Sequence, residues 1–188
     1  MGYNIKDVSY LSNLEEYTNA YTAAEDSVQA IDVSAYVDPI ARGKAKGQGL
    51  AIYRVSSSVS ADGGTPCLAA ETASFTMGLS IKPYTTTGER LSGAVAYGDL
   101  SASNDLLIYG RQFCGAASAA PGYPMASDQE FLTPTTEVPY VVVRDTIFQI
   151  MSAGVAFNAD VLCTVRMEIA MISLDQSTLN QLLRTQTA

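Results

Sequence analysis

The 188-residue sequence contains no histidine and no tryptophan, and only 16% of its residues are charged. Without histidine, the commonest general base near neutral pH and the commonest transition-metal ligand are both missing. Typical soluble domains carry about 25% charged residues, so the low value indicates a surface that neighbouring molecules cover. The net charge of −8 argues against a nucleic-acid-binding body, because such affinity comes mainly from neutralised phosphates.

Cysteine is scarce and widely spaced, with three residues at Cys67, Cys114 and Cys163. No CxxC unit occurs, so neither a zinc site nor a thioredoxin-like motif is predicted. Cys163 falls on the apolar face of an expected strand and is predicted to be buried, whereas pairing of Cys67 with Cys114 stays open. Three thiols without a disulfide framework indicate synthesis in a reducing cytoplasm. Residues 1–7 lack the apolar core of a signal peptide, and no apolar run approaches the roughly 20 residues of a membrane-spanning helix.

Two segments alternate strictly between two kinds of side chain, Ala73–Lys82 and Val161–Ile172. A period of two places alternate side chains on opposite faces of a sheet, so both segments are predicted to be strands. The second keeps Leu162, Ala170 and Ile172 on its otherwise polar face, which is typical of a strand covered on both sides at its ends.

Further strands are expected before and between these two, with connections of uneven length, which favours a jelly roll or Greek key over a simple meander. The predicted fold class is therefore all-β, a jelly-roll or Greek-key β-sandwich over residues 28–174 with short helical segments at both ends. A small-residue stretch, Gly115–Ser127, is expected to be a long loop. The remaining strand candidates are 31–37, 50–59, 106–113, 138–143 and 146–152, with an edge strand through 94–97 as a further option.

The two ends of the chain are predicted to lie outside this sandwich. Residues 1–27 are expected to form an arm or a short helix, because Ser12–Glu15 has the spacing of a capping box. An arm lying on a neighbouring subunit and a helix packed on its own domain both remain open. Residues 175–188 are predicted to form a helical tail with Asp175 or Ser177 as its N-cap.

No combination of residues predicts catalysis, so no catalytic residue, cofactor or metal is expected. Asp128 and Glu130 form the best carboxylate pair, in an expected loop, and Glu168 projects from a strand, but a glycosidase needs two carboxyl groups at a fixed separation. Neither a Ser-x-x-Lys motif nor a Gly-x-Ser-x-Gly elbow is present to activate a hydroxyl. Residues 99–105 alternate oxygen side chains like the start of a calcium loop, but lack its glycine and glutamate positions.

One dense basic cluster stands out on this acidic chain, formed by Arg42, Lys44 and Lys46 in a glycine-punctuated stretch. It is a candidate for contact with a genome or with an acidic patch on a neighbouring subunit. As a plain solvated loop it needs no partner, and that interpretation is the stronger one. Tyrosines are plentiful, and tyrosine is enriched at interfaces. The candidate anchors are Tyr17, Tyr21 and Tyr123.

The final third, through Val138–Asp145, Ile147–Met151 and Val161–Ile172, resembles the closing strands of single jelly-roll capsid proteins of small icosahedral viruses and phages. The resemblance implies a virion structural protein that self-assembles, in many copies, into an icosahedral capsid shell through β-domain, arm and loop contacts. It further implies a location in the virion, synthesis in the host cytoplasm, and other virion proteins as additional partners.

The N-terminus departs from that family, because many small-virus coat proteins carry a strongly basic arm and this one is acidic. Contact with nucleic acid is therefore expected to be weak. The alternative is a receptor- or carbohydrate-binding β-sandwich module of a phage fibre, vertex or cement protein.

Overall fold

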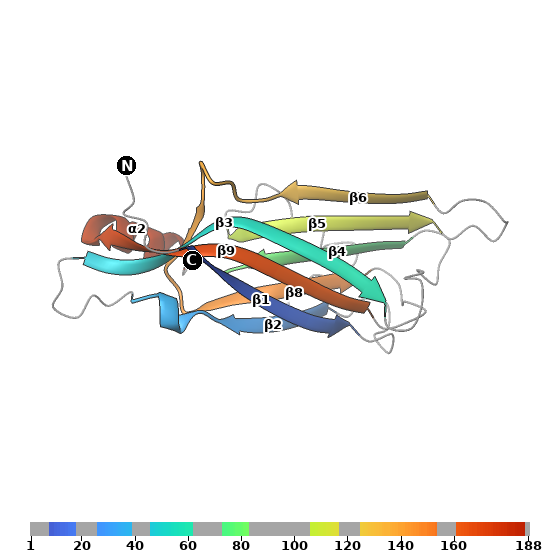
Figure 1. Ribbon diagram of the computed structural model, residues 1–188, viewed down its shortest axis with the longest axis horizontal. Helices are drawn as coiled ribbons and strands as arrows, with labels where there is room; N and C mark the ends of the chain where they lie inside the picture. Colours follow the sequence, from blue (N-terminus) through green and yellow to red (C-terminus); the bar gives the residue numbers. More distant parts are fainter. Residues whose placement is uncertain are drawn as a thin grey trace.

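The computed structural model describes residues 8–17, 26–38, 46–61, 73–82, 106–116, 125–153 and 161–186. Within these ranges the chain folds into two antiparallel sheets that lie face to face, with one α-helix at one end (Figure 1). The strands are β1 (Val8–Tyr17), β2 (Asp26–Asp32), β3 (Lys46–Ala61), β4 (Ala73–Ser80), β5 (Leu107–Ala116), β6 (Met125–Leu132), β7 (Tyr140–Val142), β8 (Thr146–Ala153) and β9 (Val161–Asp175), followed by helix α2 (Gln176–Gln186).

The strand order identifies the topology. One sheet has the order β1-β9-β3-β7 and the other β2-β8-β4-β5-β6. With β6 set aside, the first strand pairs with the last, the second with the second-last, the third with the third-last, and the middle two with each other. Such pairing is that of a long antiparallel ribbon folded over on itself. The fold is a jelly roll.

The hydrophobic core lies between the two sheets and follows the alternation of the sequence. On β9 the inward side chains Cys163, Val165, Met167 and Ile169 are fully buried, as are Met77 and Leu79 of β4. The predicted burial of Cys163 is therefore confirmed. Burying each aliphatic side chain of this size contributes about 1.5–3 kcal/mol, so this interior supplies the main stabilisation of the sandwich.

A polar group crosses the interior among these apolar side chains. Asn13 of β1 donates through Nδ2 to Oε1 of Gln29 on β2 and to Oε1 of Gln149 on β8, each at 2.8 Å. Gln149 is fully buried and donates to the carbonyl oxygen of Cys163 at 3.2 Å. These hydrogen bonds tie the two sheets together and satisfy amides that would otherwise be costly to bury.

A second apolar cluster lies outside the sandwich, beneath α2. The outward side chains Ala170, Ile172 and Leu174 of β9 are buried together with Leu179 of the helix. The sequence prediction that β9 is covered on both faces near its end is thus confirmed at its C-terminal end. Asp175 caps the helix, because its Oδ1 accepts from the backbone N–H of Thr178 at 2.7 Å, and this bond holds the pKa of the Asp175 carboxyl below its usual value.

Several sequence predictions need correction. Residues 12–17 belong to strand β1, where a short helix was expected, and β1 pairs along its whole length with β9. The capping-box spacing was misleading because pairing with β9 overrides a local helix signal. Of the expected loop Gly115–Ser127, the two ends are strand residues of β5 and β6, and 117–124 lie outside the described residues. The predicted helical tail is confirmed by α2.

Candidate functional site

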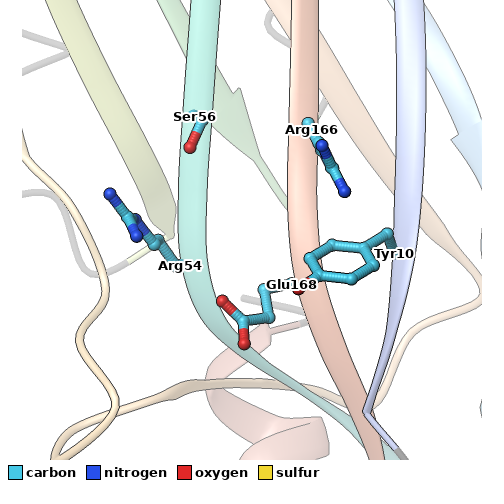
Figure 2. A pocket seen from close by; sticks show the side chains of 5 residues that line it. All are labelled: Tyr10, Arg54, Ser56, Arg166 and Glu168. Atoms are coloured by element: carbon cyan, nitrogen blue, oxygen red, sulfur yellow. The ribbon is translucent and has the colours of Figure 1, made fainter.

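The outer face of the four-stranded sheet carries a polar hollow of about 290 Å³, lined by Tyr10, Arg54, Ser56, Arg166 and Glu168 (Figure 2). Three neighbouring strands contribute to it. In the strand register Glu168 of β9 lies opposite Tyr10 of β1 and Arg54 of β3. The hollow is therefore built on sheet residues whose spacing the backbone pairing fixes.

A β-bulge in β3 determines which side chains reach this hollow. Ile52 pairs with Ile169 and Arg54 with Glu168, so Tyr53 is one extra residue in the strand. The insertion shifts the alternation by one position. Ile52 and Val55 consequently both point into the core, while Arg54 is exposed on the outer face.

Arg166 and Tyr10 form a stacked pair at the rim. The guanidinium carbon of Arg166 lies 4.2 Å from the centroid of the Tyr10 ring, and the tyrosine is 59% exposed. A cation held over an aromatic face at this distance is attracted by the ring quadrupole. In Figure 2 the carboxylate of Glu168 lies between the side chains of Arg54 and Tyr10. Two guanidinium groups against one carboxylate make this hollow locally positive on a chain of net charge −8.

A second polar group lies at the open flank of the sandwich, between β3 and β5. The hydroxyl of Tyr109 donates to Oε1 of Glu130 at 2.8 Å and lies 2.6 Å from Oγ of Ser57. Arg111 donates through Nη1 to both the carbonyl oxygen and Oγ of Ser57, at 2.7 and 2.8 Å. Burial, the largest cause, raises the pKa of Tyr109 to about 12. The phenol therefore stays protonated at neutral pH and acts as a structural donor.

This group borders a hollow of about 510 Å³ that follows β3 from Tyr53 to Ser57 and is closed on its other side by Glu130 and residues 133–136. Next to it lies a more apolar hollow of about 400 Å³. The second hollow includes Val138, which is 75% exposed. The flank thus offers both hydrogen-bonding and apolar contact surface.

The residues singled out from the sequence are only partly brought together. Lys46 is exposed at the start of β3, while Arg42 and Lys44 lie outside the described residues. Asp128 and Glu130 lie in strand β6 where a loop was expected, and Glu130 joins the Tyr109 group. Glu168 lies in the outer hollow.

Of the remaining candidate residues, some lie in strands and the others lie outside the described residues. Tyr17 is in β1 and Cys114 in β5. Tyr21, Cys67, residues 99–105 and Tyr123 lie outside the described residues. The possible pairing of Cys67 with Cys114 therefore stays a prediction.

Sequence reasoning missed Arg54, Arg166 and Tyr109. The available signal was a charged residue in the middle of each of two expected strands, but the bulge that brings Arg54 onto the face of Arg166 has no signature in the sequence. In the described parts of the chain, no group of three or more acidic or cysteine side chains is placed to hold a metal ion. No helix there is both long and apolar enough to cross a membrane.

Comparisons with known proteins give structural likeness alone. No protein-family model matches the sequence, and no curated protein sequence matches it. A solved chain of Desmodium yellow mottle tymovirus is 12% identical, with a TM-score of 0.33 and 90% of each chain covered. Merkel cell polyomavirus VP1, solved in complex with disialyllactose, is 8% identical with a TM-score of 0.38, covering 92% of this chain and 97% of the other. At such values the assignment of the jelly roll rests on the strand order described above.

Proposed function

We propose that this chain is a virion structural protein that self-assembles into an icosahedral capsid shell. The observation that carries the proposal is the jelly-roll strand order, an architecture used by viral capsid domains as well as by lectin domains and cupins. The low charged fraction of 16% supports a subunit whose surface is covered by neighbours. Stable interfaces bury on the order of 800 Å² per partner, so several interfaces per subunit account for a surface with few charges.

The interior of the sandwich supports a structural role in preference to a catalytic one. Packed apolar side chains and the Asn13–Gln149 hydrogen bonds fill the space between the sheets. The three hollows described above lie on the outer face and along the open flank. These are surfaces that contact between subunits can cover.

The first test is the mass and shape of the purified native material, measured by light scattering and electron microscopy. Closed shells of uniform size are the expected result. A monodisperse monomer or trimer over the whole accessible concentration range would overturn the proposal.

A matched pair of variants tests whether the open flank takes part in assembly. Val138→Asp places a charge in the apolar hollow, whereas Asn180→Asp places the same charge on the exposed side of α2, away from the flank. Val138→Asp is expected to abolish shells and leave the circular dichroism spectrum of the folded sandwich unchanged. Asn180→Asp is expected to assemble like the wild type. Equal assembly by both variants would exclude this hollow from the interface.

The second candidate function is carbohydrate or receptor binding, favoured by one specific observation. The Tyr10 ring is exposed on the outer face and flanked by Arg54, Ser56 and Arg166, a combination of aromatic surface and hydrogen-bond donors that suits an acidic glycan. A saturable hit on a glycan array that Tyr10→Ala removes, from protein that forms no shells, would favour this function.

A further inference from the structure

Strand β7 forms one edge of the four-stranded sheet and pairs with β3 through Tyr140, Val141 and Val142. In an antiparallel pair, alternate residues direct their backbone N–H and C=O groups toward opposite sides of the strand. An edge strand therefore presents a row of unpaired groups, which is a template for pairing with another chain. What satisfies the outer side of β7 decides whether the sheet can be extended.

The side-chain amide of Gln186, at the end of α2, occupies that position. Its Oε1 accepts from the backbone N–H of Val143 at 3.1 Å, and its Nε2 donates to the carbonyl oxygen of Val141 at 2.7 Å. One side chain thus makes the donor and acceptor contacts that a neighbouring strand would make. Gln186 is only 5% exposed, although glutamine is mostly found on protein surfaces.

The end of the helix is fixed over the edge by further contacts. Arg144 donates through Nη1 to the backbone carbonyl oxygen of Gln186 at 3.2 Å. Leu182 and Leu183 pack against the apolar cluster beneath the helix. These contacts hold the glutamine against β7 and so lower the entropic cost of ordering its side chain.

A second side chain covers the same flank of the sheet further along β3. Strand β7 pairs only with Leu50–Ile52 of β3, and within the described ranges no strand pairs with β3 beyond that point on this side. There the carbonyl oxygen of Ser57 accepts from Arg111, which reaches across from the other sheet. Charged side chains that reach inward to a sheet edge are a known protection against edge-to-edge pairing.

We propose that Gln186 is an edge guard, which keeps β7 from pairing with β7 of a second copy of this chain. The partner is a second copy because two identical antiparallel edges are self-complementary about a two-fold axis. The surface beside the edge would add to such pairing, since a hollow of about 380 Å³ there is lined by Leu106, Tyr140 and Leu182. At its β7 edge the sheet is thus closed to a further strand by a side chain of the helix that follows it.

The experiment compares Gln186→Ala with Gln186→Lys in the full-length chain. Both variants lose Oε1, the acceptor of the Val143 N–H, but a lysine at a sheet edge still opposes pairing. Amide hydrogen exchange of Val143 is measured at low and at high protein concentration, together with the mass by light scattering. In dilute solution both variants are expected to exchange about 5-fold faster than the wild type, as loss of a hydrogen bond of about 1 kcal/mol implies.

The dependence on protein concentration distinguishes a residue that prevents association from one that only stabilises the fold. In Gln186→Ala the protection of Val143 is expected to return as concentration rises, with a matching excess mass, whereas Gln186→Lys stays unprotected. Because the exchange rate of the Val143 amide in each variant is compared with that in the wild type, the test is valid whether or not the wild type forms shells. Equal association of the two variants, absence of association in both, or unchanged exchange in Gln186→Ala would each overturn the proposal.

A milder substitution covers the case in which Gln186→Ala does not fold. Gln186→Glu keeps an acceptor for the Val143 N–H and loses the donor to Val141. It is expected to keep the protection of the Val143 amide, since the bond that it loses goes to a carbonyl oxygen, which carries no exchangeable proton. Loss of Val143 protection in this variant would contradict the role assigned to Oε1.

Discussion

Two halves of the same outer sheet face differ in what they present. Toward the C-terminal end of β9, Ala170, Ile172 and Leu174 are buried under α2. Toward its N-terminal end, Thr164, Arg166 and Glu168 alternate on a face that no described helix covers. The comparison shows that a single strand can serve as core and as surface. The change is recorded in its even-numbered residues, while its odd-numbered residues from Val161 to Met171 stay apolar.

Truncating a buried side chain between α2 and the sheet is expected to have the largest effect on the free energy of unfolding. Leu179 is fully buried under the helix, and truncating a buried leucine costs about 2–5 kcal/mol through lost burial and a residual cavity. Leu179→Ala should lower the free energy of unfolding by this amount in denaturant titration. Gln181→Ala, on the exposed side of the same helix, should change it by less than about 0.5 kcal/mol. Similar losses for both would mean that α2 does not cover the sheet as described.

Adding a methyl group beneath the same helix is expected to have the next largest effect. A Cβ on Gly47 would lie 2.5 Å from Cδ2 of Leu179, so the helix or the leucine must move. Gly47→Ala should cost about 1–3 kcal/mol. In the Leu179→Ala background the methyl group has room, so the double variant should lose less stability than the sum of the two. Simple additivity would contradict the close approach of Gly47 to Leu179.

The open flank responds to alkaline pH. Because the pKa of Tyr109 is raised to about 12, the folded state favours the protonated phenol more than the unfolded chain does. Its contribution to stability is fully present below the unfolded pKa of about 10 and is lost as pH rises through about 12. The ultraviolet difference titration of wild type against Tyr109→Phe should show this phenol ionising at about pH 12. Ionisation near pH 10 would contradict its burial.

The exposed half of the outer sheet face, around Arg166 and Tyr10, is expected to contribute least to stability. An exposed cation–π pair is worth about 0.5–1 kcal/mol, so Arg166→Gln should lower the free energy of unfolding by no more than that. Ser56→Ala in the same hollow serves as the control and should lie within about 0.5 kcal/mol of wild type. A loss as large as that of Leu179→Ala would show that Arg166 is a core residue, against its exposure.

Much of the fold is readable from the sequence because one face of every central strand is buried. The alternation in Ala73–Lys82 and Val161–Ile172 predicts β4 and β9. Of the two N-caps considered for the tail helix, Asp175 and Ser177, the structure has Asp175. Strand β1 could not be read in this way. Its local pattern favours a helix, and only its pairing with β9 makes it a strand.

The candidate site was far less predictable, because it depends on which strands become neighbours. Arg54, Arg166 and Tyr10 are distant in the sequence and meet only through the register of β3, β9 and β1. Tyr109 and Ser57 come from different sheets. A single sequence gives the face on which each side chain lies within its own strand, but not the strand that lies opposite.

The bulge at Tyr53 determines whether the even-numbered or the odd-numbered side chains of β3 face the core. Before it, even-numbered residues such as Leu50 and Ile52 face inward, and after it odd-numbered residues such as Val55 do so. Deleting Tyr53 would join Ile52 directly to Arg54, and plain alternation would then still turn Arg54 outward and Val55 inward. The inserted residue therefore changes which numbers face the core after it without changing which side chains do so.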